Sequence, residues 1–214
     1  MKQKHFIDSH KGVTGLVVFG MLVYFGQWAN TTAWVYLALH GGYGIFWVLK
    51  SLRFGDKNWE QETGIAYGLV IWGSLSLYWV APLLIMTQGI QAPPWWIGLA
   101  VFVNALGVFF HFAADMEKHV SLQLRKGLVT TGLWSNCRNP NYFGELLIYG
   151  AFAMLAARDA NGWHPYGWIP AVILLTWVVA YWYPNMRRKD KSLSRYPEFE
   201  EYRRRSKLFI PYVF

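Results

Sequence analysis

The residues best suited to chemistry lie in one short stretch, Arg138 to Glu145, which reads Arg-Asn-Pro-Asn-Tyr-Phe-Gly-Glu. A proline is tolerated in a helix only in the first turn, where its missing N–H would have no partner. Pro140 therefore predicts a helix that begins near Asn139 to Asn141. The first turn of that helix offers unpaired N–H groups and the positive end of the helix dipole, which suit an anion. Arg138 adds a planar guanidinium, the group best shaped for phosphate or carboxylate.

Glu145 follows one turn later, at the start of the strongly apolar run Leu146–Ala157. An ionisable group at or below a membrane surface is costly to bury, so it is a functional candidate. We expect Arg138 to contact either a bound ligand or an internal partner, Glu145 or Asp115. The alternative, that Arg138 only anchors lipid headgroups, is less favoured.

Three further polar residues, His111, Asp115 and His119, are spaced four apart and share one face of a helix. This ladder resembles a set of metal ligands, but a zinc site needs a further protein ligand, for which the chain offers no motif. We therefore predict no metal site. His111 and Asp115 are expected to hydrogen-bond to a cofactor, and the alternative is that Asp115 and His119 are solvated at a helix end.

Two other patterns add candidates. Arg125 and Lys126 form a basic pair before the motif, where they bind either a cofactor or anionic lipid headgroups. His40 and Tyr43 flank two glycines within an apolar run, and glycines allow a ligand or a second backbone to approach closely. We expect His40 and Tyr43 to line a cavity as catalytic candidates, although a buried histidine satisfied by the protein itself is the commoner case.

The composition indicates which elements must position these residues. Hydrophobic residues make up 54% of the 214-residue chain, aromatic residues 19% and charged residues 15%, whereas soluble domains have about 25% charged residues. The 13 Trp and 13 Tyr suit the interfacial belts of a membrane protein. The single Cys137 excludes an internal disulfide. We expect an all-α, polytopic membrane helical bundle.

Membrane-spanning helices need about 17–25 mostly apolar residues, and the sequence offers six candidates, of which the fifth is short for a full crossing and is expected to include the motif residues before it. They are Gly12–Trp28, Thr32–Leu49, Ile65–Met86, Trp95–Ala113, Tyr142–Ala157 and Tyr166–Tyr183. The short link Ala29–Thr31 predicts an antiparallel hairpin between the first two. After Pro184 the chain is charged and aromatic, so we expect an amphipathic cytoplasmic helix at the C-terminus, closed near Pro211.

The distribution of charge supports this layout. With six crossings and a cytoplasmic amino terminus, every one of the 20 Lys and Arg residues except Arg158 falls on the cytoplasmic side, as the positive-inside rule requires. We therefore predict a multi-pass membrane protein, in the inner membrane if bacterial, with both termini in the cytoplasm. Residues 1–214 are expected to form one domain, with substrate-side helices in 1–113 and a cofactor-binding half in 114–214.

The motif at residues 138–145 resembles the Arg-His-Pro-Asn-Tyr-x-Gly signature of a known superfamily. That signature is shared by membrane methyltransferases of isoprenylcysteine and phospholipid type and by bacterial relatives of the steroid 5α-reductases. The tail, with Arg195–Tyr202 and then Phe209-Ile210-Pro211, looks like the end of both groups. Its Tyr-Pro pair, its terminal Ile-Pro pair and the glutamate at position 145 are closer to the reductases.

The resemblance implies a site for NADPH, which this region binds in the reductases. The residues implied around that cofactor are Asp115, Arg125, Arg138, Asn141, Tyr142, Glu145, Tyr202 and Arg205. His111 and Lys126 join this expected site from the patterns above. Asn139 stands where the signature has His, and the first span has Gln27 but no Glu of the kind that reductases pair with a Tyr on an enone carbonyl. The paired acidic residues followed by Leu that are usual in the methyltransferases are also missing.

We therefore favour an NADPH-dependent reductase of a carbon–carbon double bond in a lipid-like substrate, of steroid or enone type. Tyr43 or His40 would hydrogen-bond to or protonate the developing enolate oxygen. The excess of basic residues in the second half suits the phosphates of NADPH, although it also satisfies topology and lipid. The alternative is an S-adenosylmethionine-dependent methyltransferase in which Arg138 and Glu145 hold the cofactor, and a scaffold without catalysis is third. The expected partners are the bilayer and a hydrophobic small molecule, with no nucleic acid.

Overall fold

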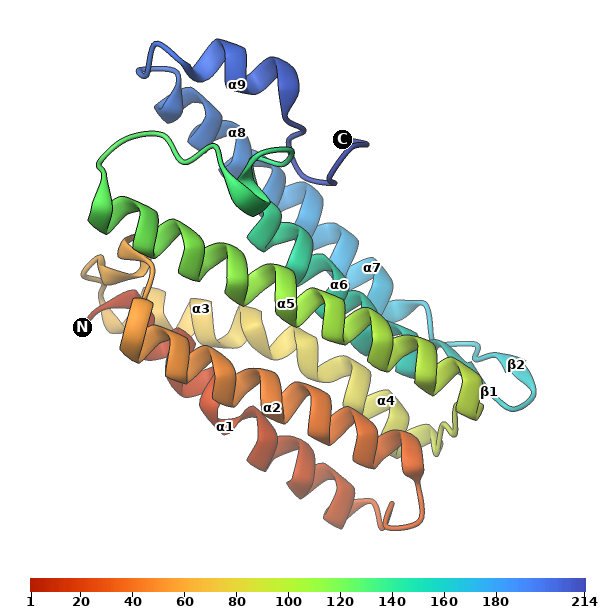
Figure 1. The fold of residues 1–214 in the computed structure, drawn as a ribbon. Coiled ribbons are helices and arrows are strands. Elements are labelled where there is room, and N and C mark those ends of the chain that lie inside the picture. The colour runs from red at the N-terminus through yellow and green to blue at the C-terminus, as the bar shows by residue number, and fades with distance from the viewer. The chain divides into compact units, whose positions relative to one another are not determined.

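A computed structural model describes residues 1–214, and nearly all of its regular structure is helical. The helices are α1 (Gln3–Tyr24), α2 (Thr31–Phe54), α3 (Ile65–Ser76), α4 (Val80–Gln88), α5 (Pro94–Leu124), α6 (Pro140–Ala157), α7 (Ile169–Trp177), α8 (Tyr183–Leu193) and α9 (Phe199–Arg205), as labelled in Figure 1. Short 3-10 helices lie at Lys57–Glu60, Leu77–Trp79 and Gly132–Trp134, and a π-helical turn at Val178–Trp182 joins α7 to α8. The strands β1 (Arg158–Asp159) and β2 (Gly162–Trp163) form a small antiparallel hairpin. The predicted all-α class is confirmed.

Four helical stretches are long and apolar enough, by length and composition, to cross a membrane. They are Gln3–Tyr24, Ile65–Gln88, Pro94–Leu124 and Ile169–Leu193. The other two predicted spans are also helical, but α2 carries the polar side chain of His40 and α6 begins with the polar residues up to Glu145. The chain is a multi-pass membrane protein, whereas the count of six crossings and the orientation of the termini stay predictions.

The chain forms two compact units, each built from two separate stretches. Unit 1 comprises residues 1–104 and 149–173, and unit 2 comprises residues 105–148 and 174–214. Because α5 and α6 each pass from one unit to the other, both contribute residues to both units.

In unit 1, α1 and α2 form the predicted antiparallel hairpin (Figure 1). The side chain of Asn30 accepts a hydrogen bond from the backbone N–H of Ala33 at 3.2 Å, which caps the start of α2. Where the two helices cross, Gly15 faces Gly41, and a Cβ at Gly44 would collide with the backbone oxygen of Lys11. Glycines at these positions let the two backbones meet.

The two ends of unit 1 differ in chemistry. At one end, the backbone N–H of Thr63 donates to the carbonyl of Met1, and the Lys2 ammonium binds Glu60 at 2.7 Å. At the other end, the first turns of α2 and α5 and the segments between helices carry exposed indoles at Trp28, Trp34, Trp95, Trp163 and Trp168. Such a cluster suits a membrane–water interface, where an amphipathic ring contacts both media.

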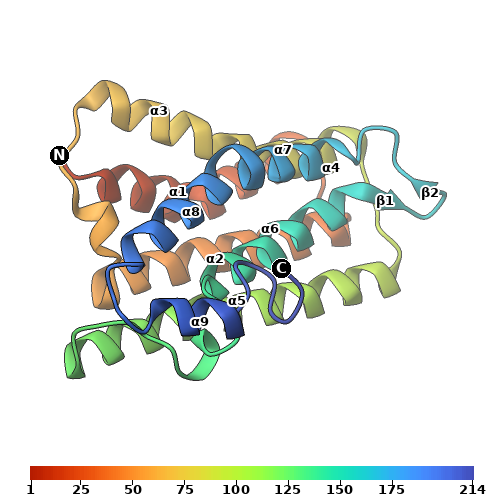
Figure 2. The same ribbon diagram turned by 90° about the horizontal axis from the view of Figure 1, so that it is seen from above.

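Unit 2 is organised by the tail of the chain. Residues 136–138 pair with Lys207 through two backbone hydrogen bonds of 2.8 and 2.9 Å, and the Tyr202 hydroxyl donates to the carbonyl of Trp134 at 2.6 Å. These contacts hold α9 beside the loop that precedes α6 (Figure 2). The predicted C-terminal helix is present, although it ends at Arg205 and not near Pro211.

Candidate functional site

The helix α6 begins at Pro140, as the motif predicts. The residue before it, Asn139, is fully buried and ties this start to the rest of unit 2. Its side-chain N–H donates to the carbonyl of Leu208 at 2.8 Å, and its side-chain oxygen accepts from the Lys189 ammonium at 3.0 Å. The first turn of α6 is therefore fixed by the tail and by α8.

Arg138 is buried, with 6% of its surface exposed, and most of its donors bond to the protein. Nε donates to both carboxylate oxygens of Asp190, at 3.1 and 3.2 Å, and Nη1 donates to the carbonyl oxygen of Ser206 at 2.6 Å. Nη2 has no hydrogen-bond partner in the protein. The expected internal partners, Glu145 and Asp115, are wrong: the counterion is Asp190, because the polar face of α8 and not α5 lies against this guanidinium.

A second polar cluster joins α5 to the start of α6. The Asn141 amide donates to the Asp115 carboxylate at 3.1 Å, and His111 Nδ1 lies 3.1 Å from the carbonyl oxygen of Asn141. His111 Nε2 lies 3.9 Å from the Asp115 carboxylate. The side-chain oxygen of Asn141 is buried without a hydrogen-bond partner, and an orphaned acceptor of this kind calls for a donor from a ligand or a water.

Two glycines bring these helices together. A Cβ added at Gly144 would collide with the backbone N–H of His111, and one at Gly107 would come within 2.8 Å of the carbonyl oxygen of Gly144. The ring of Phe110 packs edge-on against Phe143 beside this crossing. The glycine of the motif therefore has a structural role, since it allows His111 and Asp115 to reach Asn141.

The remaining predicted cofactor residues occupy different surroundings. Tyr142 contacts the Trp182 ring, with centroids 5.6 Å apart, and Glu145 is half-buried. Tyr202 is buried in unit 2, but Arg205 on the same helix is exposed. Arg125 and Lys126 are also exposed, just beyond the end of α5, and form no salt bridge. The structure thus brings together His111, Asp115 and Asn141, and separately Arg138 and the α9 segment, while three cations stay in solvent.

Burial also sets the protonation of two groups beside Arg138. It raises the pKa of the Cys137 thiol to about 11, and the S–H donates to the carbonyl of Phe209 at 3.2 Å. Burial likewise raises the pKa of the Tyr202 hydroxyl, so this group stays protonated and donates to Trp134. Cys137 and Tyr202 are therefore neutral and add no charge beside the Arg138–Asp190 pair.

The histidine ladder on α5 does not converge on one point. His111 lies against Asp115, whereas the ring of His119 lies 2.8 Å from the side chain of Gln123. The structure contains no group of three or more His, Cys, Asp or Glu residues that could hold a metal ion.

In unit 1 the catalytic candidates are both buried. The Tyr43 hydroxyl accepts a hydrogen bond from the Lys11 ammonium at 3.0 Å, and Tyr149 accepts from the same ammonium at 2.8 Å. His40 Nδ1 lies 2.9 Å from the Tyr36 hydroxyl, and its ring stacks on Phe152. His40 is therefore satisfied by the protein, and Tyr43 belongs to a cluster around a buried cation.

Two important residues are missed by the sequence analysis. Lys11 falls outside the first predicted span, which begins at Gly12, but α1 begins at Gln3 and so contains it. An ionisable residue so close to an apolar run is the signal that could have found it. Asp190 lies in a run of basic residues, where nothing in the local pattern singles it out.

Comparison with known proteins gives a family. Residues 55–206 match the model of a family described as "Protein of unknown function (DUF1295)". The chain belongs to the DUF1295 family. This is a steroid 5α-reductase-like family of membrane proteins, so the resemblance is confirmed at this level, and a more specific placement belongs to the proposals below.

A curated relative is similar to this chain beyond the motif alone. A cobalt-zinc-cadmium resistance protein, CzcN, of Cupriavidus metallidurans is 30% identical over 170 residues, which cover 78% of this chain and 60% of the relative. The chain thus spans 60% of that relative's length, less than two thirds. No solved structure matches this chain.

Proposed function

We propose that this DUF1295 protein is a membrane-embedded reductase that uses NADPH to reduce a carbon–carbon double bond in a lipid-like substrate of steroid or enone type. The observation that supports this most is the buried guanidinium of Arg138 at the start of α6. Its Nη2 donors are not used by the protein, so they can bind an anionic group of a ligand.

The residues at the start of α6 fit a phosphate-rich cofactor. Arg125, Lys126 and Arg205 are exposed cations in the same unit as Arg138, and NADPH carries several phosphate charges. The first turn of α6 adds N–H groups without intrahelical partners. The orphaned oxygen of Asn141 is an acceptor for an amide or hydroxyl donor of the ligand. When bound, NADPH would supply the hydride.

The other residues would orient the cofactor and polarise the substrate. Asp115 and His111 fix the side chain and backbone of Asn141, so they would act on the cofactor by holding Asn141 in place. In unit 1, Tyr43 would donate a hydrogen bond to the carbonyl oxygen of the substrate, where negative charge develops as the double bond is reduced. His40, with its Tyr36 partner and stacked on Phe152, is better suited to shaping that region than to proton transfer.

Two other functions are weaker. A methyltransferase would need a site for the sulfonium of S-adenosylmethionine, and Asp115 and Glu145 are the carboxylates that would serve it. Metal resistance is the role that the name of the CzcN relative suggests, but this chain offers no cluster of metal ligands. The reductase is therefore preferred to both.

The test is calorimetric titration of the purified protein with NADPH and, separately, with S-adenosylmethionine. We expect NADPH to bind and the double variant Arg125→Ala, Lys126→Ala to bind it more weakly, because two surface cations near the phosphates are lost. Arg195→Ala, which removes an exposed cation elsewhere in unit 2, is the matched control and should bind as the wild type does. Binding of S-adenosylmethionine without NADPH would support the methyltransferase, and indifference to both would leave a scaffold.

A further inference from the structure

Lys11 is an unusual feature of α1. It lies inside a helix that is apolar enough to cross a membrane, and it is only 6% exposed. Burying an ammonium is expensive unless its donors are satisfied. An apolar residue at this position would avoid that cost, so the cation indicates a specific role for this position.

The surroundings of Lys11 fix its ammonium in place. Gly44 lets α2 approach the backbone at Lys11 so closely that any Cβ would collide with its carbonyl oxygen. The ammonium then donates to the hydroxyls of Tyr43 and Tyr149, and it lies 4.0 Å from the centroid of the Trp47 ring. We call Lys11, Tyr43, Trp47 and Tyr149 the Lys11 cluster.

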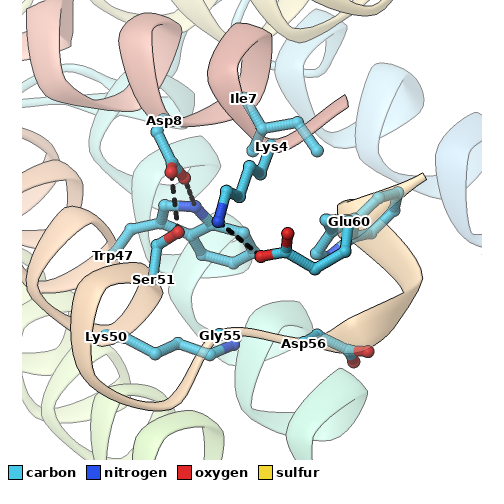
Figure 3. Close-up of a pocket in the computed structure, with 10 residues that line it drawn as sticks. Lys4, Ile7, Asp8, Trp47, Lys50, Ser51, Gly55, Asp56 and Glu60 are labelled. Carbon is cyan, nitrogen blue, oxygen red and sulfur yellow. Dashed lines mark hydrogen bonds and ion pairs between the residues drawn. The ribbon is translucent and has the colours of Figure 1, made fainter. Parts of the chain in front are cut away.

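Trp47 is also held at the edge of its indole ring. Its indole N–H donates to Asp8 at 3.0 Å, and Asp8 also accepts from Ser51 at 2.6 Å. These residues line a surface hollow of unit 1 together with Lys4 and Glu60 (Figure 3). The Trp47 ring is therefore oriented by these hydrogen bonds, and it also faces a hollow at the surface.

The chemistry of the Lys11 cluster is that of a strengthened hydrogen-bond donor. An ammonium is a donor only, so both phenol oxygens accept from it and direct their own hydrogens to other acceptors. A cation at 3.0 Å stabilises negative charge on the phenol oxygen, and this strengthens the O–H as a donor. Tyr43 is thus suited to an oxygen on which negative charge develops.

His10, the neighbour of Lys11 in sequence, gives independent support for a ligand in this unit. It is 2% exposed and both of its ring nitrogens lack a hydrogen-bond partner. Its ring stacks on Trp79 and meets Trp72 edge-on. Buried polar atoms without partners are rare in native structures, and a polar group on a bound molecule would satisfy them.

We propose that Lys11, acting through Tyr43, is a positioning residue that makes the Tyr43 hydroxyl a strong hydrogen-bond donor to the carbonyl oxygen of an enone ligand, an inference that rests on the proposed reductase function. Tyr43 contacts the ligand, whereas Lys11 places a positive charge beside the Tyr43 hydroxyl and orients it. The trio of Lys11, Tyr43 and Tyr149 would then serve in place of a glutamate beside a tyrosine, since α1 contains no glutamate.

The test uses a 4-en-3-one steroid labelled with ¹³C at its carbonyl carbon, added to the full-length protein in detergent without any nucleotide. In the wild type the carbonyl resonance of the bound probe should move downfield from its position in empty micelles, because its oxygen accepts a strong hydrogen bond. In Tyr43→Phe this displacement should be lost, and the affinity should fall about tenfold or more. Lys11→Met should reduce the displacement, and Lys11→Arg, which keeps the charge, should restore most of it.

The matched control is Lys50→Met, which removes a second buried lysine whose ammonium lies 4.6 Å from the same Trp47 ring. It should leave the displacement unchanged. A full displacement in Lys11→Met, or no bound probe in the wild type, would overturn the inference. NADPH titration of the same samples separates the two proposals: NADPH binding without a carbonyl displacement overturns only the role of Lys11, and the reverse result overturns only the NADPH site.

Discussion

The pair Arg138–Asp190 offers the sharpest test of how the start of α6 is held. Asp190→Asn keeps the shape of the side chain but removes the only carboxylate that bonds to a guanidinium with 6% of its surface exposed. Removing one partner of a buried pair costs about 3–5 kcal/mol, because the remaining charge is left uncompensated. For a chain of this size each kcal/mol moves the midpoint of thermal unfolding by about 2–4 °C, so we expect a loss of about 6–20 °C.

The assay is thermal unfolding of the protein in detergent at a fixed scan rate, since unfolding of membrane proteins is often irreversible. The control is Glu200→Gln, which breaks an exposed pair with Arg203 at 3.8 Å and should cost no more than about 1 kcal/mol. The double variant Arg138→Met, Asp190→Leu should be more stable than Asp190→Asn, because no charge stays buried. If Asp190→Asn unfolds at the same temperature as Glu200→Gln, then Arg138 is not clamped as described.

Three further outcomes are expected. Gly144→Ala should destabilise the protein by about 1–3 kcal/mol or more in thermal unfolding, since the new Cβ collides with α5. In the control Gly150→Ala on the same helix, the new Cβ meets nothing within 4 Å, so stability should not fall. Cys137 should resist maleimide at pH 8 in the folded protein and react only after unfolding, because burial raises the pKa of its thiol to about 11. The pKa of Glu60 is lowered to about 2, mainly by its hydrogen bond to Lys2. This contact therefore stabilises the fold fully at pH values above the ordinary pKa of a carboxyl group, and its contribution is lost as the pH falls toward 2. A carboxyl NMR titration with a midpoint near 4.5, and unchanged in Lys2→Met, would contradict that pairing.

The helices follow from the sequence because their causes are local. Long apolar runs, the proline that opens α6 and the turn residues between helices each act within a few positions along the chain. Even so, the first span was expected to begin at Gly12, and α1 begins nine residues earlier. The polar residues before Gly12 hide the helix start, because their side chains bond to distant partners on α2 and around Glu60.

The candidate site was predictable only where contacts are close in sequence. The shared face of His111 and Asp115 follows from their spacing of four, and both do lie together at Asn141. The counterion of Arg138 lies 52 residues away and the second tyrosine on Lys11 lies 138 residues away. Such pairings are decided by how helices pack, which no local pattern reports.

The proposal that NADPH is the cofactor of this protein can be tested by identifying the small molecule that the purified protein carries. Denaturation of the wild type followed by mass spectrometry of the released small molecules should give NADPH or NADP⁺, in an amount that falls in the Arg125→Ala, Lys126→Ala variant and persists in Arg195→Ala. Release of S-adenosylmethionine or its demethylated product in place of the nicotinamide nucleotide would show that NADPH is not the cofactor.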